Sequence, residues 1–484
     1  MTEAPVAHRP WPIFWLLAVT QFMVILDTTI VAIALPEIQR DVGFTPSGLS
    51  WVMDGYMLVF GGFVLLGGRA ADLAGRRRML VLGMTLFVLS SVLCVMATEP
   101  WMLVVGRMVQ GLGGALASPA ALALVLQVLP EGASRTRGMA IWGGIAGVAG
   151  PTGVLLGGAL SEVAWELVFM INAPIGIAVI VFGLRMLPGG QRYVKGDLDV
   201  FGALSGTAGL CLLVFGVMRG AVEGWGSAVT VLTLGAAVVL LLAFVARQVK
   251  AANPLLPRSL FGVPTVVLGV AASGLLGMAL YGSFITNTLN LQQARGYSAI
   301  VAALLLIPLD ICLFAGTSVA GRVMARMGPS TVLSSGLGLQ AVALVWWASV
   351  LDAHDNVWLS TVLPASVASF GLGAAIVCVF VIGTSNVSGE LSGTASGMVV
   401  TANQVGGAIG IAALTTVAAT HTTGLLAGGA PDRAQAVSSG QSVALWVAAG
   451  VAAVGALVGL LLKRDHGATW RRATPVAAGG AAPE

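Results

Sequence analysis

The sequence predicts an all-α membrane protein that crosses the bilayer many times. Of its 484 residues, 57% are hydrophobic and 9% are charged, whereas an ordinary soluble domain has about 25% charged residues. Apolar runs of about 20 residues, the length that spans a bilayer as a helix, recur along the whole chain. No polar stretch between them is long enough for a soluble domain. The chain is therefore expected to be a polytopic helical protein.

Fourteen apolar segments are candidate membrane helices. Several contain Gly or Pro, which membrane helices tolerate because neighbouring groups satisfy the freed backbone. The first segment is not expected to be a cleaved signal peptide, because it is too long and carries Asp27 in its middle. The segments are 13–35, 49–68, 79–98, 101–127, 138–160, 167–187, 199–219, 227–247, 264–288, 298–320, 331–351, 358–382, 393–418 and 440–462.

The basic residues predict how these helices are oriented. With fourteen spans, both chain ends and every loop after an even-numbered span share one side, and 19 of the 24 Lys and Arg residues fall there. Four fall on the opposite side, and Arg107 lies within a span. Since basic loops stay in the cytoplasm, we expect a cytoplasmic-membrane protein with both termini inside. Loops 289–297, 352–357 and 419–438 are then expected outside.

The chain also repeats itself, which indicates duplication of a six-helix unit. Residues 68–75 resemble 321–328, residues 111–115 resemble 371–375, and the Gly-rich run from Gly138 resembles that from Gly397. Such repeats predict a solute site near the midplane, between two halves that rock in alternating access. The expected units are an N-terminal half 1–187, two inserted helices in 188–257, a C-terminal half 258–462 and a disordered tail 463–484.

The residue types exclude several classes of function. The four cysteines lie in apolar runs without a CxxC pair, so neither a disulfide framework nor a metal site is expected. The chain has no GxxxxGK[ST] loop and no HExxH motif. Its basic residues are scattered over short loops, which argues against a nucleic-acid partner. We therefore expect neither an enzyme nor a bound cofactor, and an ion gradient as the energy source.

Four ionisable residues lie inside the predicted spans: Asp27, Asp54, Arg107 and Asp310. A charge at the bilayer centre costs about 2.5–3.5 kcal/mol, so each should face a cavity or a partner. At about 1.5 Å per residue, the first three lie roughly 13, 12 and 10 Å from the outer ends of their spans, while Asp310 lies roughly 18 Å deep in the other half. Structural alternatives remain: a tie to a neighbouring helix for Asp27, the water interface for Asp54 and helix capping after Pro308 for Asp310.

The balance of these charges predicts their chemistry. Three carboxylates against one guanidinium favour cations and protons over anions. Desolvation favours a protonated carboxyl group and an adjacent cation favours the ionised one. We therefore expect Asp27 to exchange the proton, poised by Arg107, with Asp54 as a second acid. Asp310, together with Asp54 and Asp27, is expected to hold a cationic substrate.

A charged turn follows the second span. Gly68 and Gly75 bound it, and Asp72 lies close in sequence to Arg76 and Arg77. Such a turn can lock two helix ends together, and these five residues are the expected conformational switch. The alternative is that the arginines only fix the topology.

The fifth span is rich in glycine around a proline. Small residues let helices approach closely, and a proline removes one backbone hydrogen bond. Tight helix packing is therefore expected around Gly147, Gly150, Pro151, Gly157 and Gly158.

Four stretches together resemble signature motifs of the major facilitator superfamily, in its fourteen-helix drug:proton antiporter branch. They are LDTTIVAIALP (26–36), GRAADLAGRRRML (68–80), RMVQGLGGA (107–115) and GPTGVLLGG (150–158). The resemblance implies two six-helix halves with two additional central helices. It also implies that 68–80 serves the conformational switch, that 150–158 is the exporter motif and that the intramembrane acids serve cation recognition and proton coupling.

The sequence also departs from the pattern of that family. The second copy of the charged turn has Ala325 where Asp72 stands in the first, and span 13 has Asn403 and Gln404 where exporters of divalent cations carry acids. These departures favour a monovalent lipophilic cation. His354 and His421 fall in outer loops and are expected to be solvated.

The predicted function is a monomeric exporter of lipophilic, cationic drugs or natural products, driven by proton influx. Its partners would be the small molecule, protons and the lipid bilayer. One alternative is the same fold serving a single endogenous metabolite or antibiotic, as in self-resistance. An alternative of another class is a membrane-embedded lipid-handling or sensor protein, although no nucleophile–base pair suggests such chemistry.

Overall fold

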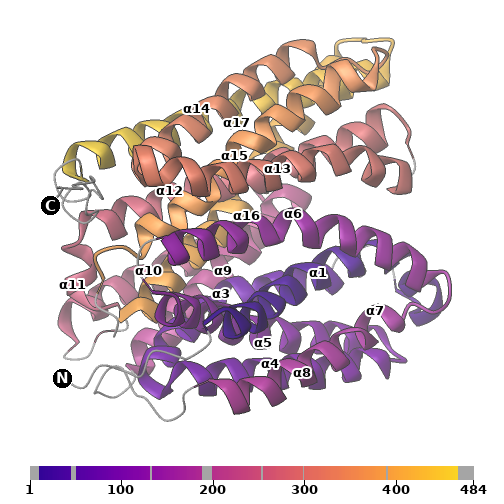
Figure 1. Ribbon diagram of the computed structural model, residues 1–484. Helices are drawn as coiled ribbons and strands as arrows, with labels where there is room; N and C mark the ends of the chain where they lie inside the picture. Colours follow the sequence, from indigo (N-terminus) through magenta and orange to yellow (C-terminus); the bar gives the residue numbers. More distant parts are fainter. Residues whose placement is uncertain are drawn as a thin grey trace, which may run out of the picture.

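The computed structural model describes residues 10–44, 49, 51–130, 133–187, 199–251, 254, 256–297, 299–387 and 391–466. Within these ranges every regular element is a helix (Figure 1). Thirteen of the described helices are long and apolar enough to cross a membrane, and Phe201–Val217 is a shorter apolar helix. This arrangement confirms the fourteen-helix, all-α membrane fold that the sequence predicts.

The first group of helices, which we call the N-half, packs mainly within itself. It contains α1 (Pro10–Val42), α3 (Trp51–Ala74), α4 (Arg76–Val95), α5 (Pro100–Val128), α6 (Ala133–Ser161), α7 (Leu167–Met170) and α8 (Asn172–Met186). Its most buried span is α5, whose apolar window is 78% buried, so α5 lies in the interior of this half.

The second group, the C-half, is built in the same way. It contains α12 (Pro264–Leu289) with the π-helical η1 (Asn290–Ala294), α13 (Ala299–Met327), α14 (Pro329–Val350), η2 (Trp358–Val362), α15 (Leu363–Gly383), α16 (Ser392–Ala427) and α17 (Arg433–His466). The apolar window that runs through α15 is 72% buried, so α15 takes the interior position here.

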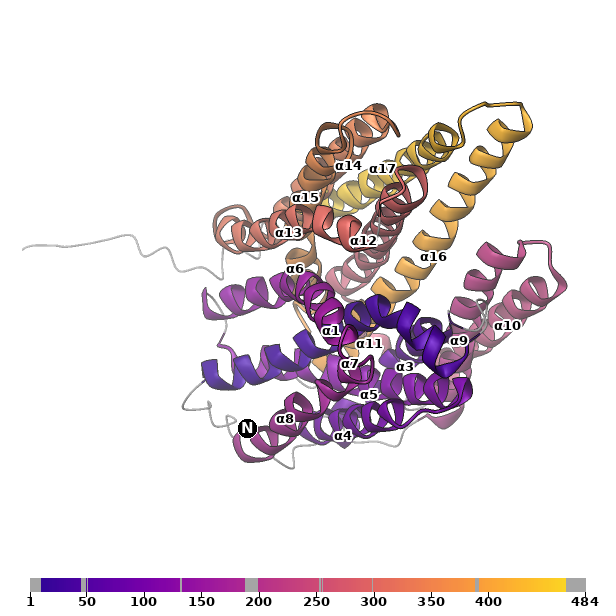
Figure 2. The ribbon, with the colours of Figure 1, turned by 90° about the vertical axis from the view of Figure 1, so that its right-hand side faces the viewer.

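Two helices and a short one connect the halves: α9 (Val200–Glu223), α10 (Ala228–Lys250) and α11 (Arg258–Phe261). The α9 helix packs against α3 of the N-half and α16 of the C-half, and Figure 2 shows the α9–α10 pair beside both. The halves also meet directly, where α3 packs on α16 and α6 packs on α13. Figure 1 shows α1 beginning and α17 ending at one end of the bundle, which we call the terminal end.

Several helices are longer than the apolar runs that predict them. The second span was expected to end at residue 68, but α3 continues to Ala74 and so includes Asp72. The loop expected over 419–438 is helical up to Ala427, where α16 ends, and α17 continues to His466. Hydropathy reports the thickness of the hydrocarbon layer, whereas a helix ends where its backbone hydrogen bonds end. Residues 188–198 and 467–484, in the expected linker and tail, lie outside the described residues.

The two halves repeat one close helix crossing. A Cβ atom on Gly83 of α4 would lie 2.6 Å from the Gly113 oxygen of α5, and one on Gly336 of α14 would lie 2.7 Å from the Gly371 oxygen of α15. Only glycine permits such backbone contact. The crossing therefore makes Gly83 equivalent to Gly336, and Gly113 equivalent to Gly371.

The neighbours of the crossing fix its register. A Cβ atom on Gly113 would meet the Phe87 nitrogen at 2.7 Å, and one on Gly371 would meet the Gln340 nitrogen at 2.8 Å. Equivalent residues of α5 and α15 are thus 258 positions apart, as Gly113 and Gly371 are. The sequence repeat suggested 260, which is wrong by two residues because both segments are rich in Gly and Ala and align equally well by composition.

Candidate functional site

A buried ion pair lies in the interior of the N-half. Asp27 comes from α1 and Arg107 from α5, and both side chains are 0% exposed. Arg107 Nη1 donates to Asp27 Oδ2 at 2.5 Å. The two charges that the sequence placed at one depth are therefore direct partners, and neither is left uncompensated in the membrane.

Three polar side chains complete this network. Gln110 Nε2 donates to Asp27 Oδ1 at 2.9 Å and to Ser91 Oγ at 2.9 Å, and Asn172 Nδ2 donates to Asp27 Oδ1 at 2.8 Å. All three are buried. The carboxylate of Asp27 thus accepts hydrogen bonds from three side chains, those of Arg107, Gln110 and Asn172. The sequence reasoning missed these residues because it considered only ionisable groups, although amides inside apolar spans were a usable signal.

Arg107 also ties α5 to α3. Its Nε atom donates to the Val52 carbonyl at 2.9 Å, and its guanidinium lies 4.4 Å from the centre of the Tyr56 ring, a cation–π geometry. Asp54 lies in the first turn of α3, where it is half-buried. The structure thus pairs two of the three charges that share a depth, Asp27 and Arg107, directly.

A second buried carboxylate joins the two halves at the terminal end. Asp72 of α3 accepts hydrogen bonds from the backbone nitrogens of Gly393 at 3.0 Å and Thr394 at 2.6 Å, and from Thr394 Oγ1 at 2.8 Å. These groups form the first turn of α16, where unpaired N–H groups and the helix dipole attract an anion. Asp72 of the N-half thus caps a helix of the C-half, and Arg76 Nη2 pairs with the same carboxylate at 3.2 Å.

The glycines of the charged turn serve close approach and chain reversal. A Cβ atom on Gly68 would lie 2.5 Å from the Gly393 oxygen and 3.0 Å from Gly397 Cα, so α3 and α16 touch through their backbones. Gly75 has φ of 101°, a conformation that side chains other than glycine rarely adopt. Arg77 donates to the Leu184 carbonyl at the end of α8. Gly393 and Thr394 could not be found from spacing, since they lie more than 300 residues from Asp72.

Helix α6 packs between the halves through its glycines. A Cβ atom on Gly144 would lie 2.9 Å from both Phe314 and Thr317 of α13. A Cβ atom on Gly150 would lie 4.0 Å from Asp310 Oδ2. The glycines at these positions thus face the C-half.

Farther along α6 the packing partner changes to α1. A Cβ atom on Gly157 would lie 2.9 Å from the Ile30 oxygen, whereas one on Gly158 would have nothing within 4 Å. The expectation of tight packing is therefore wrong at Gly158, which lies on a different face of α6. The surroundings of Gly147 and Pro151 lie outside the described residues.

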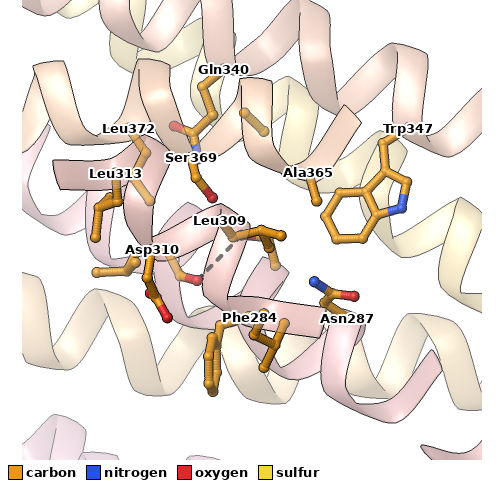
Figure 3. A pocket seen from close by; sticks show the side chains of 14 residues that line it. Phe284, Asn287, Leu309, Asp310, Leu313, Gln340, Trp347, Ala365, Ser369 and Leu372 are labelled. Atoms are coloured by element: carbon orange, nitrogen blue, oxygen red, sulfur yellow. Dashed lines mark hydrogen bonds between the residues drawn. The ribbon is translucent and has the colours of Figure 1, made fainter. Parts of the chain in front are cut away.

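Asp310 lies at a cavity inside the C-half. The cavity is bounded by α12, α13, α14 and α15, and its lining is mostly apolar (Figure 3). Asp310 is half-buried, and the ion pairs found among the described residues do not include it. Asp310 comes from the C-half and faces Gly150 of α6 across the half interface.

Three polar residues of this cavity carry atoms without hydrogen-bond partners among the described residues. They are Asn287 Oδ1, Gln340 Oε1 and Trp347 Nε1. The residues are 1%, 1% and 2% exposed. An unpartnered buried polar atom costs about 1–3 kcal/mol, so the cavity is suited to a guest that supplies partners. The sequence reasoning did not identify these residues.

The described residues contain no group of three or more His, Cys, Asp or Glu side chains that could hold a metal ion. The four cysteines Cys94, Cys211, Cys312 and Cys378 are free.

The family model described as Major Facilitator Superfamily matches residues 17–411. The "Cephamycin export protein CmcT" of Amycolatopsis lactamdurans is 37% identical over 83% of this chain and 84% of its own length. The "Tetracenomycin C resistance and export protein" of Streptomyces glaucescens is 33% identical over 84% of this chain and 75% of its own. The "Puromycin resistance protein pur8" of Streptomyces alboniger is 33% identical over 95% and 92%.

Solved structures share the fold. The human organic anion transporter MFSD10 superimposes with a TM-score of 0.67 at 14% identity, covering 94% of this chain and all of that chain. The proton:xylose symporter XylE superimposes with a TM-score of 0.62 at 15% identity, covering 93% and 94%. At these identities the likeness concerns the fold alone. Together with the matching family model and relatives, it shows that this chain belongs to the Major Facilitator Superfamily.

Proposed function

We propose that this protein is a proton-driven antiporter that exports lipophilic, cationic drugs or natural products across the cytoplasmic membrane by alternating access. Its family and the names of its relatives support export of small molecules rather than an enzymatic reaction. The observation that carries the proposal is the buried Asp27–Arg107 pair, because an exchangeable carboxyl group inside the membrane is what proton coupling requires.

The network around Asp27 supports a coupling step. In the present conformation Arg107, Gln110 and Asn172 all donate to its carboxylate. If the halves rock and Arg107 moves away, desolvation favours the protonated carboxyl. Proton uptake and release then follow the conformational change. Asp54 is proposed as a second, more exposed acid.

The Asp72 contacts support a gate at the terminal end. The cap on α16 and the backbone contact of Gly68 hold the two halves together there. The excess of basic residues supports a cytoplasmic position for this end, so the present conformation would be closed to the cytoplasm. Loading of substrate would require Asp72 to release the start of α16. The close packing of the α6 glycines would let the halves move against each other without letting protons or solutes leak through.

The cavity in the C-half supports binding of the substrate. It offers an apolar lining, as ligand pockets do, and the carboxylate of Asp310 at one end. A carboxylate that has no basic partner among the described residues favours a cationic guest.

A narrower function is a dedicated exporter of one antibiotic made by the host. The names of two relatives favour it, since each couples export to a single natural product. A screen of puromycin, tetracenomycin C and tetraphenylphosphonium in drug-sensitive cells separates the two, because a dedicated exporter raises resistance to one compound only. A lipid-handling or sensor protein would raise resistance to none.

The test of coupling is transport in proteoliposomes under an imposed pH gradient, with proton flux and drug accumulation measured in the same vesicles. Asp27→Asn keeps a polar side chain of the same shape, so the protein should fold, yet it should lose drug accumulation and drug-induced proton flux. Accumulation against the drug gradient at the wild-type rate would assign the proton to another group.

A further inference from the structure

The cavity in the C-half occupies the place where the N-half carries its charged network. At the offset of 258 residues that the helix crossing fixes, Arg107 is equivalent to Ala365 and Gln110 to Ala368. Both alanines line the cavity. Methyl groups thus stand where a guanidinium and an amide fill the space in the other half. The cavity is therefore a feature of the side chains within a shared backbone arrangement.

The walls of this cavity keep buried polar atoms that its neighbours do not satisfy. Asn287 projects from α12, and Gln340 and Trp347 project from α14. Figure 3 shows Asn287 and Trp347 close together at one end of the cavity, with Asp310 at the other. The unpartnered atoms are two amide oxygens and one indole nitrogen. An indole N–H can only donate, and an amide oxygen can only accept.

These groups define complementary features of a guest. The indole N–H requires an acceptor, such as a carbonyl or hydroxyl oxygen. The amide oxygens require O–H or N–H donors, and Asp310, which faces the half interface at Gly150, suits an amine. A bulky cation without hydrogen-bonding groups would satisfy Asp310 and leave the other three buried and unpaired.

We propose that this cavity selects amine-bearing natural products that also carry O–H or N–H donors and carbonyl or hydroxyl acceptors, in preference to purely apolar cations. The inference rests on the proposed export function and specifies its substrate. A site built to hydrogen-bond its ligand rejects an analogue that lacks the groups, because the polar atoms of the site then stay buried without partners.

The test measures the Kd of two probes on the purified full-length protein by equilibrium dialysis. Puromycin carries an amine, hydroxyl groups and an amide, whereas tetraphenylphosphonium is a lipophilic cation without hydrogen-bonding groups. Gln340→Leu and Asn287→Leu should each weaken puromycin about tenfold, the size of one lost hydrogen bond to a buried group, and leave tetraphenylphosphonium unchanged. Asp310→Asn should weaken both probes.

Two further variants keep the result interpretable. Gln441→Leu is the matched control, because Gln441 is another buried amide with an unpartnered oxygen among the described residues but does not line the cavity. It should change neither Kd. Trp347→Phe removes only the N–H donor and keeps most of the ring volume, so it should fold and weaken puromycin alone, even where a leucine variant does not fold.

The possible results separate this inference from the proposed function. In the Gln340, Asn287 and Trp347 variants, two results would overturn the selective cavity. One is an equal loss of affinity for the two probes, and the other is an unchanged Kd for puromycin. Wild-type protein that exports tetraphenylphosphonium but does not bind puromycin would also overturn it, while export itself would stand. Wild-type protein that transports neither probe nor any other compound of the screen would overturn both.

Discussion

The N-half and the C-half place opposite chemistry on one helix crossing. Around the α4–α5 crossing, Arg107 and Gln110 fill the interior and bind Asp27. Around the equivalent α14–α15 crossing, Ala365 and Ala368 leave a cavity. The equivalent distances from a Cβ atom on these glycines to the facing backbone differ by 0.1–0.4 Å between the two crossings, so the main difference lies in the side chains. One scaffold thus supports a packed interior with a paired charge in one half and a hollow interior beside Asp310 in the other.

The terminal end shows the same asymmetry. Gly75 and Gly328 both have positive φ, 101° and 80°, and both precede the next helix. Yet Asp72 before Gly75 caps α16, whereas the second copy has Ala325 in that place. The turn is repeated and its carboxylate is not, so the contact that Asp72 makes with α16 has no counterpart at Ala325.

The largest expected effect is loss of the charged interior. Arg107→Ala leaves Asp27 buried without its cation, and breaking a buried pair in this way costs about 3–5 kcal/mol. Thermal and denaturant unfolding in detergent would measure it. Asp27→Leu combined with Arg107→Leu should regain much of that stability but no transport, because a well-packed apolar pair can replace a buried ion pair. A double variant as unstable as the single one would contradict the distinction between stability and coupling.

The next effect concerns the gate. Asp72→Ala removes the charge-assisted hydrogen bonds to the start of α16, which together contribute at least about 1.5–3 kcal/mol. Their loss should open the terminal end. Ser396 of α16 is 0% exposed. A cysteine there, in a cysteine-free background, should then react with a thiol reagent at least tenfold faster. Ala325→Asp is the matched change in the other half. If it accelerated the reaction of the cysteine at position 396 to a similar extent, the single gate at Asp72 would be contradicted.

A reciprocal exchange tests the two interiors directly. Gln110→Ala makes the N-half resemble the C-half and should cost about 1–3 kcal/mol, since it removes a donor from the buried Asp27. Ala368→Gln places an amide in the cavity and should weaken substrate binding while proton flux through the Asp27 network persists. Unfolding and proteoliposome transport of both variants would measure this. Equal loss of proton-coupled transport in the two variants would contradict the assignment of proton coupling to the N-half and substrate binding to the C-half.

The smallest effect lies at the end of the bundle opposite the terminal end. The N-half carries an exposed Arg40–Glu37 pair there, whereas in the C-half His354 Nε2 lies 2.5 Å from Asp432 Oδ2 and joins two loops. The hydrogen bond with Asp432 raises the pKa of His354, and the same bond lowers the pKa of Asp432. Both members of the pair are therefore charged at pH values between the lowered pKa of Asp432 and the raised pKa of His354.

The sign of the pH dependence follows. A histidine whose pKa is raised by folding contributes stability that is complete below its unfolded pKa and lost as the pH rises through its folded pKa. Hydrogen exchange in residues 351–357 should therefore be faster at about pH 8 than at about pH 6, beyond the intrinsic rate change. His354→Gln should remove this difference. The Arg40–Glu37 pair contains no histidine, so an equal change around it would contradict the assignment.

The sequence by itself determined the features that depend on local order along the chain. Apolar runs set the number of spans, the glycine-bounded turn set Asp72 against Arg76, and the depth count put Asp27 and Arg107 at one level, where the structure pairs them. Each of these follows from a spacing of a few residues or a rise of 1.5 Å per residue, so no knowledge of the packing was needed.

Only the tertiary structure decided which faces of the helices meet. Depth gives the height of a residue in the membrane but not its rotation about the helix axis, so it did not reveal that Gln110 and Asn172 turn toward Asp27. The cap of Asp72 on Thr394 and the bond from Asn172 to Asp27 join helices far apart in sequence. The cavity beside Ala368 depends on how four helices pack around small side chains, and such packing is a property of the assembled bundle.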